Sequence, residues 1–203
     1  MTTGMRESVA AVHKLVSELV PNDEWEERHQ TETLHWLRGT DDVFRRVKPA
    51  TPPRHLVSYV VPVDPADRSV LLVDHVNAGL WLPPGGHVDP DEHPAEAARR
   101  EAYEELGVPV ESGLVAEEPV FITVTRTVGI DAGHTDVSLW FVLQLDRQRP
   151  LMLDGGEFRE ARWWSPAEVR DADPARFDPH FTRFWSKLHG DRVEDDSCHR
   201  TQP

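Results

Sequence analysis

The chain has 203 residues, of which 36 are Asp or Glu and 22 are Lys or Arg, so its formal net charge is −14. This length suits one ordinary domain with an extension, and the acidic balance argues against a surface that coats nucleic acid. A nucleotide can still bind, because a divalent metal neutralises its phosphates locally. Cys198 is the single cysteine, which excludes a disulfide framework, and no signal segment or membrane-length apolar run is present. We therefore expect a reducing, cytoplasmic location and no membrane partner.

Residues 1–50 predict a helical extension and a linker. Apolar side chains recur at helical spacing between residues 5 and 20, and a second helical pattern runs to about Leu37. Gly39 ends this second pattern, and a proline-rich linker follows it. We expect both helices to pack on the following domain or on a partner subunit, and the second arrangement would make the protein a homodimer. The acidic composition of the second helix argues against contact with DNA.

Residues 51–190 predict a second unit, which is rich in β-strands. Four runs have strand-like composition: 55–64, 69–75, 120–129 and 135–146. A helix capped by Ser165 and a final helix near residues 179–188 follow them. This order of strands and helices suits an α/β fold in which a mixed sheet is covered by helices on both faces. Residues 191–203 are polar and acidic, which predicts a disordered tail.

Residues 86–108 carry the most specific pattern of the chain, G-x5-E-x7-R-E-U-x-E-E-x-G-U, in which U is an apolar residue. The fixed positions are all matched, by Gly86, Glu92, Arg100, Glu101, Glu104, Glu105 and Gly107. Within this pattern, Pro94 to Leu106 predicts a helix, because proline is tolerated in a first turn and alanine, arginine and glutamate favour helix. Gly107 is expected to end the helix in a left-handed conformation.

Three carboxylates of this helix are expected on one of its faces. At about 100° per residue, Glu101, Glu104 and Glu105 span roughly 100°. Their like charges repel one another, and a hard divalent cation neutralises such a set because it prefers oxygen ligands. A solvated acidic face on a surface helix is the alternative reading. The matched glycines and arginine favour the metal site.

The pattern resembles the signature of the Nudix hydrolase family, which includes the MutT-like enzymes. The resemblance covers about residues 55–188 and implies the Nudix α/β/α sandwich, with a mixed β-sheet between helices. It also implies a Mg²⁺-dependent hydrolase, in which Mn²⁺ can substitute, that cleaves a phosphoanhydride in a nucleoside diphosphate linked to a further group X. The expected partner is a small-molecule nucleotide, either a nucleoside triphosphate or a nucleotide-sugar-like diphosphate. No subfamily motif decides between the two.

The Nudix fold also occurs in modules that bind a nucleotide without cleaving it. Such modules commonly lose a glutamate or the arginine of the pattern. All of these residues are intact here. Catalysis is therefore preferred, and a nucleotide-sensing module remains the alternative.

The resemblance implies roles for individual residues of the pattern. Glu101 and Glu105 are expected to bind the metal together with the carbonyl oxygen of Gly85. Glu104 is expected to be a further ligand or the base that deprotonates water. Arg100 is expected to orient the glutamates rather than to bind metal. Gly86 lets the backbone come close to a ligand or metal.

Other candidates lie before the helix and outside the pattern. Glu92 can satisfy free backbone N–H groups or reach a second metal, and His87 can contact a phosphate. Glu157 and Glu160 follow paired glycines and are candidates for a catalytic carboxylate on a mobile loop, Glu157 being preferred. Both can equally be ordinary loop residues. His134 and Asp136 alternate on a predicted strand, where they either face the substrate or form structural hydrogen bonds.

Overall fold

The computed structural model describes most of the chain, residues 5–48, 50–109, 116–127, 133–153 and 156–190. Its helices and strands are α1 (Glu7–Glu18), α2 (Glu24–Gly39), β1 (Arg54–Val63), β2 (Val70–His75), β3 (Leu80–Leu82), β4 (Gly85–His87), α3 (Pro94–Leu106), β5 (Phe121–Arg126), β6 (Thr135–Gln144), β7 (Phe158–Trp164), α4 (Pro166–Asp171) and α5 (Phe181–His189). A short 3₁₀ turn at Pro174–Arg176 precedes α5. The predicted tail at 191–203 lies outside the described residues. No helix among those described is long and apolar enough to cross a membrane.

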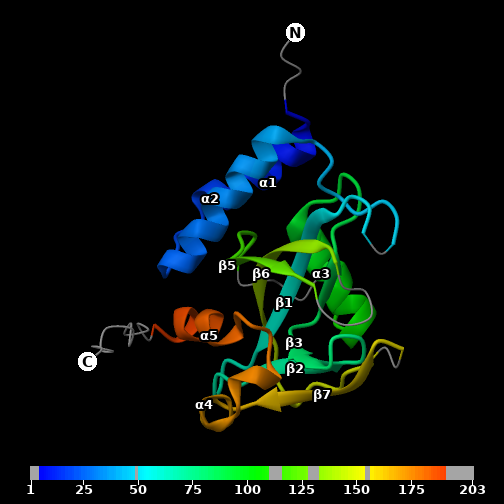
Figure 1. The fold of residues 1–203 in the computed structure, drawn as a ribbon. Helices are drawn as coiled ribbons and strands as arrows, with labels where there is room; N and C mark the ends of the chain where they lie inside the picture. Colours follow the sequence, from blue (N-terminus) through cyan, green and yellow to red (C-terminus); the bar gives the residue numbers. More distant parts are fainter. Residues whose placement is uncertain (1–4, 49, 110–115, 128–132, 154–155, 191–203) are drawn as a thin grey trace, which may run out of the picture.

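The strands form one mixed sheet in the order β3-β2-β1-β6-β5, with β4 beside β1 and β7 beside β2 (Figure 1). The central strands β1 and β6 are parallel, and the remaining pairs are antiparallel. Ten residues of β1 pair with ten of β6, which places His55 opposite Asp136. The short strand β4 pairs with β1 so that His87 lies opposite Val57. These pairings bring residues from distant parts of the chain to one end of the sheet.

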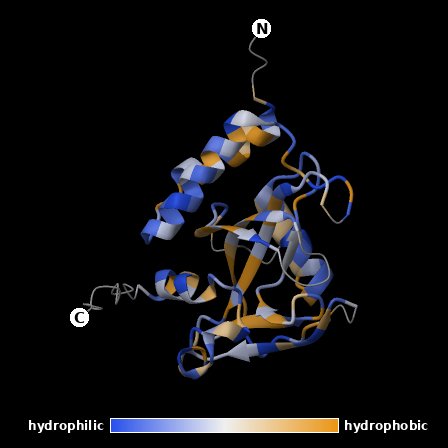
Figure 2. Cartoon of the chain, viewed as in Figure 1, coloured by the Kyte–Doolittle hydropathy of each residue, from blue (hydrophilic) through white to orange (hydrophobic). Residues whose placement is uncertain are grey.

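Apolar side chains cover both faces of the sheet, as the alternation along its strands predicts. One buried cluster joins the sheet to α1, α2 and α3, and a second joins it to α4 and α5. Along β1, Val60 belongs to the first cluster and Val61 to the second. Figure 2 shows the apolar residues concentrated on these strands, whereas the outer surfaces of the helices are largely hydrophilic. The predicted α/β fold with helices on both faces is confirmed.

The N-terminal helices pack on the same chain, beside the edge strand β5, as Figure 1 shows for α2. Asp23 caps α2 and accepts a hydrogen bond of 2.9 Å from Arg183 of α5. Lys187 of α5 donates to the fully buried Glu26 of α2 at 2.6 Å. Packing on the following domain was one of the two expected arrangements, and α2 thereby protects the open edge of the sheet. The homodimer stays a prediction.

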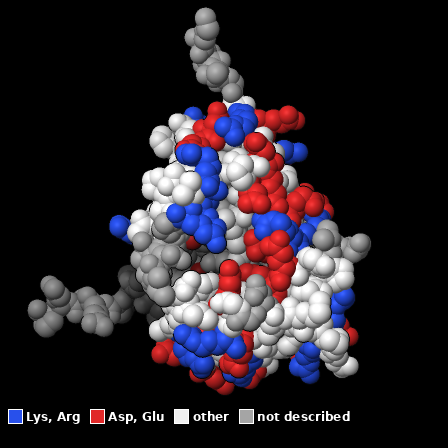
Figure 3. All heavy atoms as spheres, turned by 90° about the vertical axis from the view of Figure 1, so that its right-hand side faces the viewer, with Lys and Arg blue, Asp and Glu red and all other residues white. Residues whose placement is uncertain are grey.

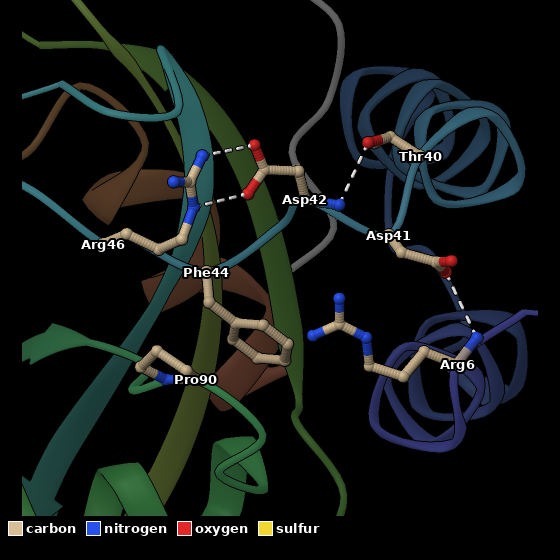
Figure 4. A pocket seen from close by; sticks show the side chains of 7 residues that line it. All are labelled: Arg6, Thr40, Asp41, Asp42, Phe44, Arg46 and Pro90. Atoms are coloured by element: carbon tan, nitrogen blue, oxygen red, sulfur yellow. Dashed lines mark hydrogen bonds and ion pairs between the residues drawn. The ribbon is translucent and has the colours of Figure 1, made fainter.

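The segment after α2 joins the extension to the loop before α3, around a small pocket shown in Figure 4. Asp41 accepts a hydrogen bond from the backbone of Arg6, and Asp42 accepts two from Arg46 at 3.0 and 2.8 Å. Phe44 and Pro90 also line this pocket. These contacts fix the turn that follows, whose basic residues reach the large pocket described below.

Candidate functional site

The helix α3 spans Pro94–Leu106, the bounds that the sequence predicted. The ring nitrogen Nδ1 of His93 accepts a hydrogen bond from the backbone of Ala95 and caps the N-terminus. Gly107 ends the helix at φ 66°, in the left-handed conformation expected of it. The buried face of α3 consists largely of alanines, which allow the helix to lie close to the sheet: Ala95, Ala97, Ala98 and Ala102. This packing turns the glutamates towards a large pocket.

Glu101, Glu104 and Glu105 all line this pocket, and we call them the acidic face. Glu101 and Glu105 are buried, whereas the side chain of Glu104 is 55% exposed. Arg100 donates to Glu101 at 2.7 Å and to Glu104 at 3.2 Å, the second being the expected i,i+4 pair. Glu105 is held differently, by a hydrogen bond of 2.8 Å from the backbone N–H of Gly85. The two buried carboxylates are thus fixed in place, and the exposed one is less constrained.

Two glycines of β4 make this arrangement sterically possible. A Cβ atom on Gly86 would lie 2.3 Å from Oε1 of Glu101. A Cβ on Gly85, whose φ is 149°, would lie 2.3 Å from the carbonyl oxygen of Ser58. Any larger residue would therefore displace either the glutamate or the β4 backbone. Gly86 thus leaves room for Glu101, and Gly85 allows β4 to lie close to β1.

The charges of the acidic face oppose one another in the absence of a cation. Burial, assisted by the charges of Glu104 and Glu157, raises the pKa of Glu101 to about 7 against the lowering effect of Arg100. The pKa of Arg100 is raised, first by its hydrogen bond to Glu92 and then by that to Glu101. Buried carboxylate oxygens that repel one another are the donor set that a hard divalent cation prefers. The residues present therefore fit Mg²⁺ or Mn²⁺.

The other candidates from the sequence divide between the pocket and its surroundings. Glu157 and His87 line the pocket, and Glu157 lies close enough to affect the pKa of Glu101. Glu160 is exposed on β7 and is not among the residues that line the pocket. Glu92 accepts a hydrogen bond from the backbone of Asp89 and pairs with Arg100 at 2.9 Å. Glu92 therefore contacts the arginine that holds the glutamates.

A group of basic residues reaches the same pocket from the turn after α2. Arg45, Arg46 and Lys48 line the pocket together with Arg126 of β5. On the face of the molecule that Figure 3 shows, basic and acidic side chains lie next to each other. The pocket therefore combines carboxylates that can hold a cation with basic groups that can contact an anion.

A second set of polar residues lies at the wall of this pocket, on the sheet rather than on a helix, with one member behind the lining residues. We call it the histidine cluster, and its members are His55, His87, His134 and Asp136. One ligand atom from each residue lies within 4.8 Å of those of the others. Burial lowers the pKa of His87 to about 2, and the positive charge of Arg45 adds to this effect.

Only part of this cluster is identified from the sequence alone. The sequence indicates His87 and the pair His134 and Asp136 as candidates, but it does not indicate His55 as a site residue. The signal that could have found His55 is its place in the β1–β6 register, opposite Asp136. That register is a tertiary feature, which no local pattern specifies.

Comparisons with known proteins agree with this geometry. The NUDIX domain family model matches residues 53–184. The m7GpppN-mRNA hydrolase NUDT17 of Bos taurus is 28% identical over 115 residues, which are 50% of this chain and 38% of that protein. Nudix hydrolase 25 of Arabidopsis thaliana is 28% identical over 121 residues, which are 51% of this chain and 69% of that protein. The chain thus spans little more than a third of the first relative and about two thirds of the second.

The fold is shared with solved structures of low sequence identity. The MutT protein from Methanosarcina mazei Go1 aligns with a TM-score of 0.55 and 19% identity, over 68% of this chain and 95% of that one. At this identity the likeness concerns the fold alone. The family match, however, covers more than half of the chain and includes the whole pattern from Gly86 to Val108. The chain belongs to the Nudix hydrolase family.

Proposed function

We propose that this protein is a metal-dependent hydrolase that cleaves a phosphoanhydride bond in a nucleoside diphosphate linked to another group. The observation that carries the proposal is the acidic face, in which Glu101 and Glu105 are buried and anchored beside the β4 glycines. Such a costly arrangement of like charges is stable with a divalent cation bound. The intact Arg100, which contacts two of the three carboxylates, supports catalysis over nucleotide sensing.

The chain's own residues can divide the chemistry between them. A bound Mg²⁺ would neutralise charge on the phosphate oxygens and lower the pKa of an attacking water. Glu101 and Glu105 would hold the cation, with the carbonyl of Gly85 as a further ligand. Glu104 or Glu157 accepts the proton of the attacking water, because both line the pocket and Glu104 is not fixed by burial.

The basic turn after α2 supports an anionic substrate. Arg45 and Lys48 line the same pocket as the carboxylates and can bind phosphates that the metal does not neutralise, while Arg46 beside them is paired with Asp42. The substrate is then a nucleoside triphosphate or a nucleotide-sugar-like diphosphate. The m7GpppN named for the bovine relative also contains phosphates in series, the bond type proposed here.

A Mg²⁺-dependent screen against nucleoside triphosphates, nucleotide sugars and dinucleotides tests the proposal. We expect Mg²⁺ or Mn²⁺ to be required and the products to show which phosphoanhydride is cut. Glu105→Gln should abolish most of this activity, whereas Glu160→Gln, which alters an exposed carboxylate outside the pocket, should not. Nucleotide binding by calorimetry without turnover of any compound would instead establish the sensing module.

A further inference from the structure

The histidine cluster is built from three parts of the sheet. His55 belongs to β1, His87 ends β4, and His134 and Asp136 lie at the start of β6. His87, His134 and Asp136 line the pocket, and the fully buried His55 lies behind them. The Nε2 atoms of His55 and His134 are 3.2 and 3.3 Å from Oδ1 of Asp136, and Nε2 of His87 is 4.0 Å from it. Three imidazole nitrogens therefore converge on one carboxylate oxygen.

The hydrogen bonds of His55 determine which of its nitrogens carries a proton. Its Nδ1 lies 2.8 Å from the carbonyl oxygen of Pro52, which can only accept. In the neutral ring Nδ1 is therefore protonated, and Nε2 presents a lone pair to Asp136. Among the described residues, neither Nε2 of His55 nor Oδ1 of Asp136 has a hydrogen-bond donor. Two buried acceptors at 3.2 Å repel each other unless a proton or a cation lies between them.

The same reasoning applies to His134. The hydroxyl oxygen of Thr127 accepts a hydrogen bond from the backbone N–H of His134 at 3.3 Å and lies 3.2 Å from its Nδ1. When this hydroxyl donates to the carbonyl oxygen of His134, at 3.1 Å, Nδ1 donates in turn to the hydroxyl, and Nε2 then presents a lone pair to Asp136. Outer partners that fix the tautomer in this way are the usual surroundings of metal-binding histidines.

We propose that the histidine cluster binds a divalent first-row transition metal such as Zn²⁺, separately from the hard cation of the acidic face. Ligand atoms with bonds of about 2.0–2.1 Å in a tetrahedral site lie about 3.3 Å apart. The two shorter contacts to Asp136 already have this separation. The four ligand atoms lie within 4.8 Å of one another, so the widest pair has to close by up to about 1.5 Å. One ion satisfies all four residues, whereas one extra proton on His55 satisfies only its own contact with Asp136.

The donor set also predicts the role of the ion. Three nitrogens and one oxygen favour zinc-like ions over Mg²⁺, which prefers oxygen ligands and keeps several waters. Four protein ligands close a tetrahedral site, which is typical of stabilising ions. The ion joins β4 to β1 and β6, and β4 carries Gly85 and Gly86, which lie next to the acidic face. It therefore holds the backbone on which the acidic face depends.

Metal titration of the full chain, without an affinity tag and after treatment with a chelator, tests this site. Co²⁺ serves as the visible probe and Zn²⁺ as its competitor, with excess Mg²⁺ present to occupy the acidic face. We expect one equivalent of Co²⁺ to give the intense absorption of tetrahedral coordination and Zn²⁺ to displace it. Zn²⁺ should also raise the melting temperature, since it binds the folded state only.

His134→Gln and Asp136→Asn are the test variants, because each keeps the approximate size of the side chain and avoids the fully buried His55. Each should weaken Zn²⁺ binding by at least about 10–100-fold, the loss that an outer partner alone can cause. His75→Gln is the matched control, since His75 lines the same pocket outside the cluster. It should bind as the wild type does.

Three outcomes would overturn the proposal: no tetrahedral Co²⁺ spectrum in the wild type, unchanged affinity in both variants, or an equal loss in the His75→Gln control. None of these measurements needs a substrate. They therefore do not depend on the hydrolase proposal, and failure of one proposal leaves the other standing.

Discussion

The acidic face and three of the four residues of the histidine cluster line one pocket, but the two sets are held together by opposite means. The acidic face consists of like charges, which are held in place by hydrogen bonds from Arg100 and from a backbone N–H of β4. The histidine cluster consists of three imidazole rings around one carboxylate, with Nδ1 of His55 donating to Pro52 and Nδ1 of His134 in contact with Thr127. The first offers oxygen donors to a hard cation, and the second offers mainly nitrogen donors. The two sets of ligands can therefore bind two different kinds of metal ion within one pocket.

The largest expected effect comes from removing a carboxylate of the acidic face. Glu104→Gln and Glu105→Gln should each lower kcat by roughly 10²–10⁴. A positioned carboxylate contributes this much when it assists proton transfer, and we expect a similar loss when a carboxylate that would hold the cation is removed. Steady-state kinetics on the substrate found in the screen measure the effect. Circular dichroism should show the fold intact. Wild-type turnover in both variants would contradict the role given to the acidic face.

The loop carboxylates supply an internal comparison for this effect. Glu157 lines the pocket and Glu160 does not. Glu157→Gln should therefore reduce kcat if Glu157 accepts the proton of the attacking water, while Glu160→Gln should leave kcat unchanged. Equal losses in the two variants would show that the segment acts through its conformation.

The close approach of β4 to Glu101 predicts a smaller loss. Gly86→Ala would place a methyl group 2.3 Å from a carboxylate oxygen of Glu101 and displace it. Activity should fall by about 10–100-fold, since a displacement of about 1 Å at a catalytic group has this cost. Gly39→Ala is the control, because a Cβ there meets nothing within 4 Å. A fully active Gly86→Ala protein would show that Glu101 can move without consequence.

A crossed pair of variants tests whether the two donor sets are separate. Glu105→Gln should weaken Mn²⁺ binding by about 10-fold or more and leave Zn²⁺ affinity unchanged, whereas His134→Gln should do the reverse. Electron paramagnetic resonance follows free Mn²⁺, and competition with Co²⁺ reports Zn²⁺. A variant that weakens both metals equally would indicate one shared site.

The smallest effect concerns a histidine that needs no metal. Burial, Arg183 and His29 lower the pKa of His180 from 6.5 to about 4, and Arg183 donates to its Nδ1 at 2.9 Å. The unfolded chain takes up this proton below about pH 6.5, whereas the folded chain does so only near pH 4. Stability from this group is therefore present above pH 6.5 and is lost as the pH falls towards 4.

Between pH 7.5 and pH 4.5 the free energy of unfolding should fall by about 1–2 kcal/mol less in His180→Gln than in the wild type. This difference is smaller than the energy equivalent of the full pKa shift, because the ring is partly exposed. Urea unfolding at pH 7.5 and pH 4.5 measures it. An identical pH dependence in the wild type and the variant would rule out His180 as the source.

The two regions also differ in how far the sequence could predict them. The bounds of helix α3 can be predicted from local sequence. Its proline lies in the first turn, its alanines and glutamates favour helix, and its glycine ends the helix in the left-handed conformation. The spacing of Glu101, Glu104 and Glu105 then places them on one face without further information. The mixed sheet and its helices on both faces followed from the order of the elements and the family resemblance.

The histidine cluster could not be predicted in this way. His55 and Asp136 meet because β1 and β6 are parallel, and a long crossover rather than a tight turn joins such strands. No hairpin turn sets the register between β1 and β6. The alternation of apolar and polar residues along each strand shows only which residues share a face, not which residues of the two strands lie opposite each other. The basic turn around Arg45 was missed for a similar reason, since its approach to the pocket depends on how Asp42 and Arg46 pack after α2.

The most direct test of two metal sites in one pocket is anomalous diffraction from a crystal soaked in Mn²⁺ and Zn²⁺, recorded at both absorption edges. We predict a manganese peak bounded by Glu101 and Glu105 and a distinct zinc peak bounded by His55, His134 and Asp136. A pocket without manganese at the glutamates would contradict the proposed catalytic centre. Zinc at the glutamates with none at the histidines would contradict the separation of the two sites.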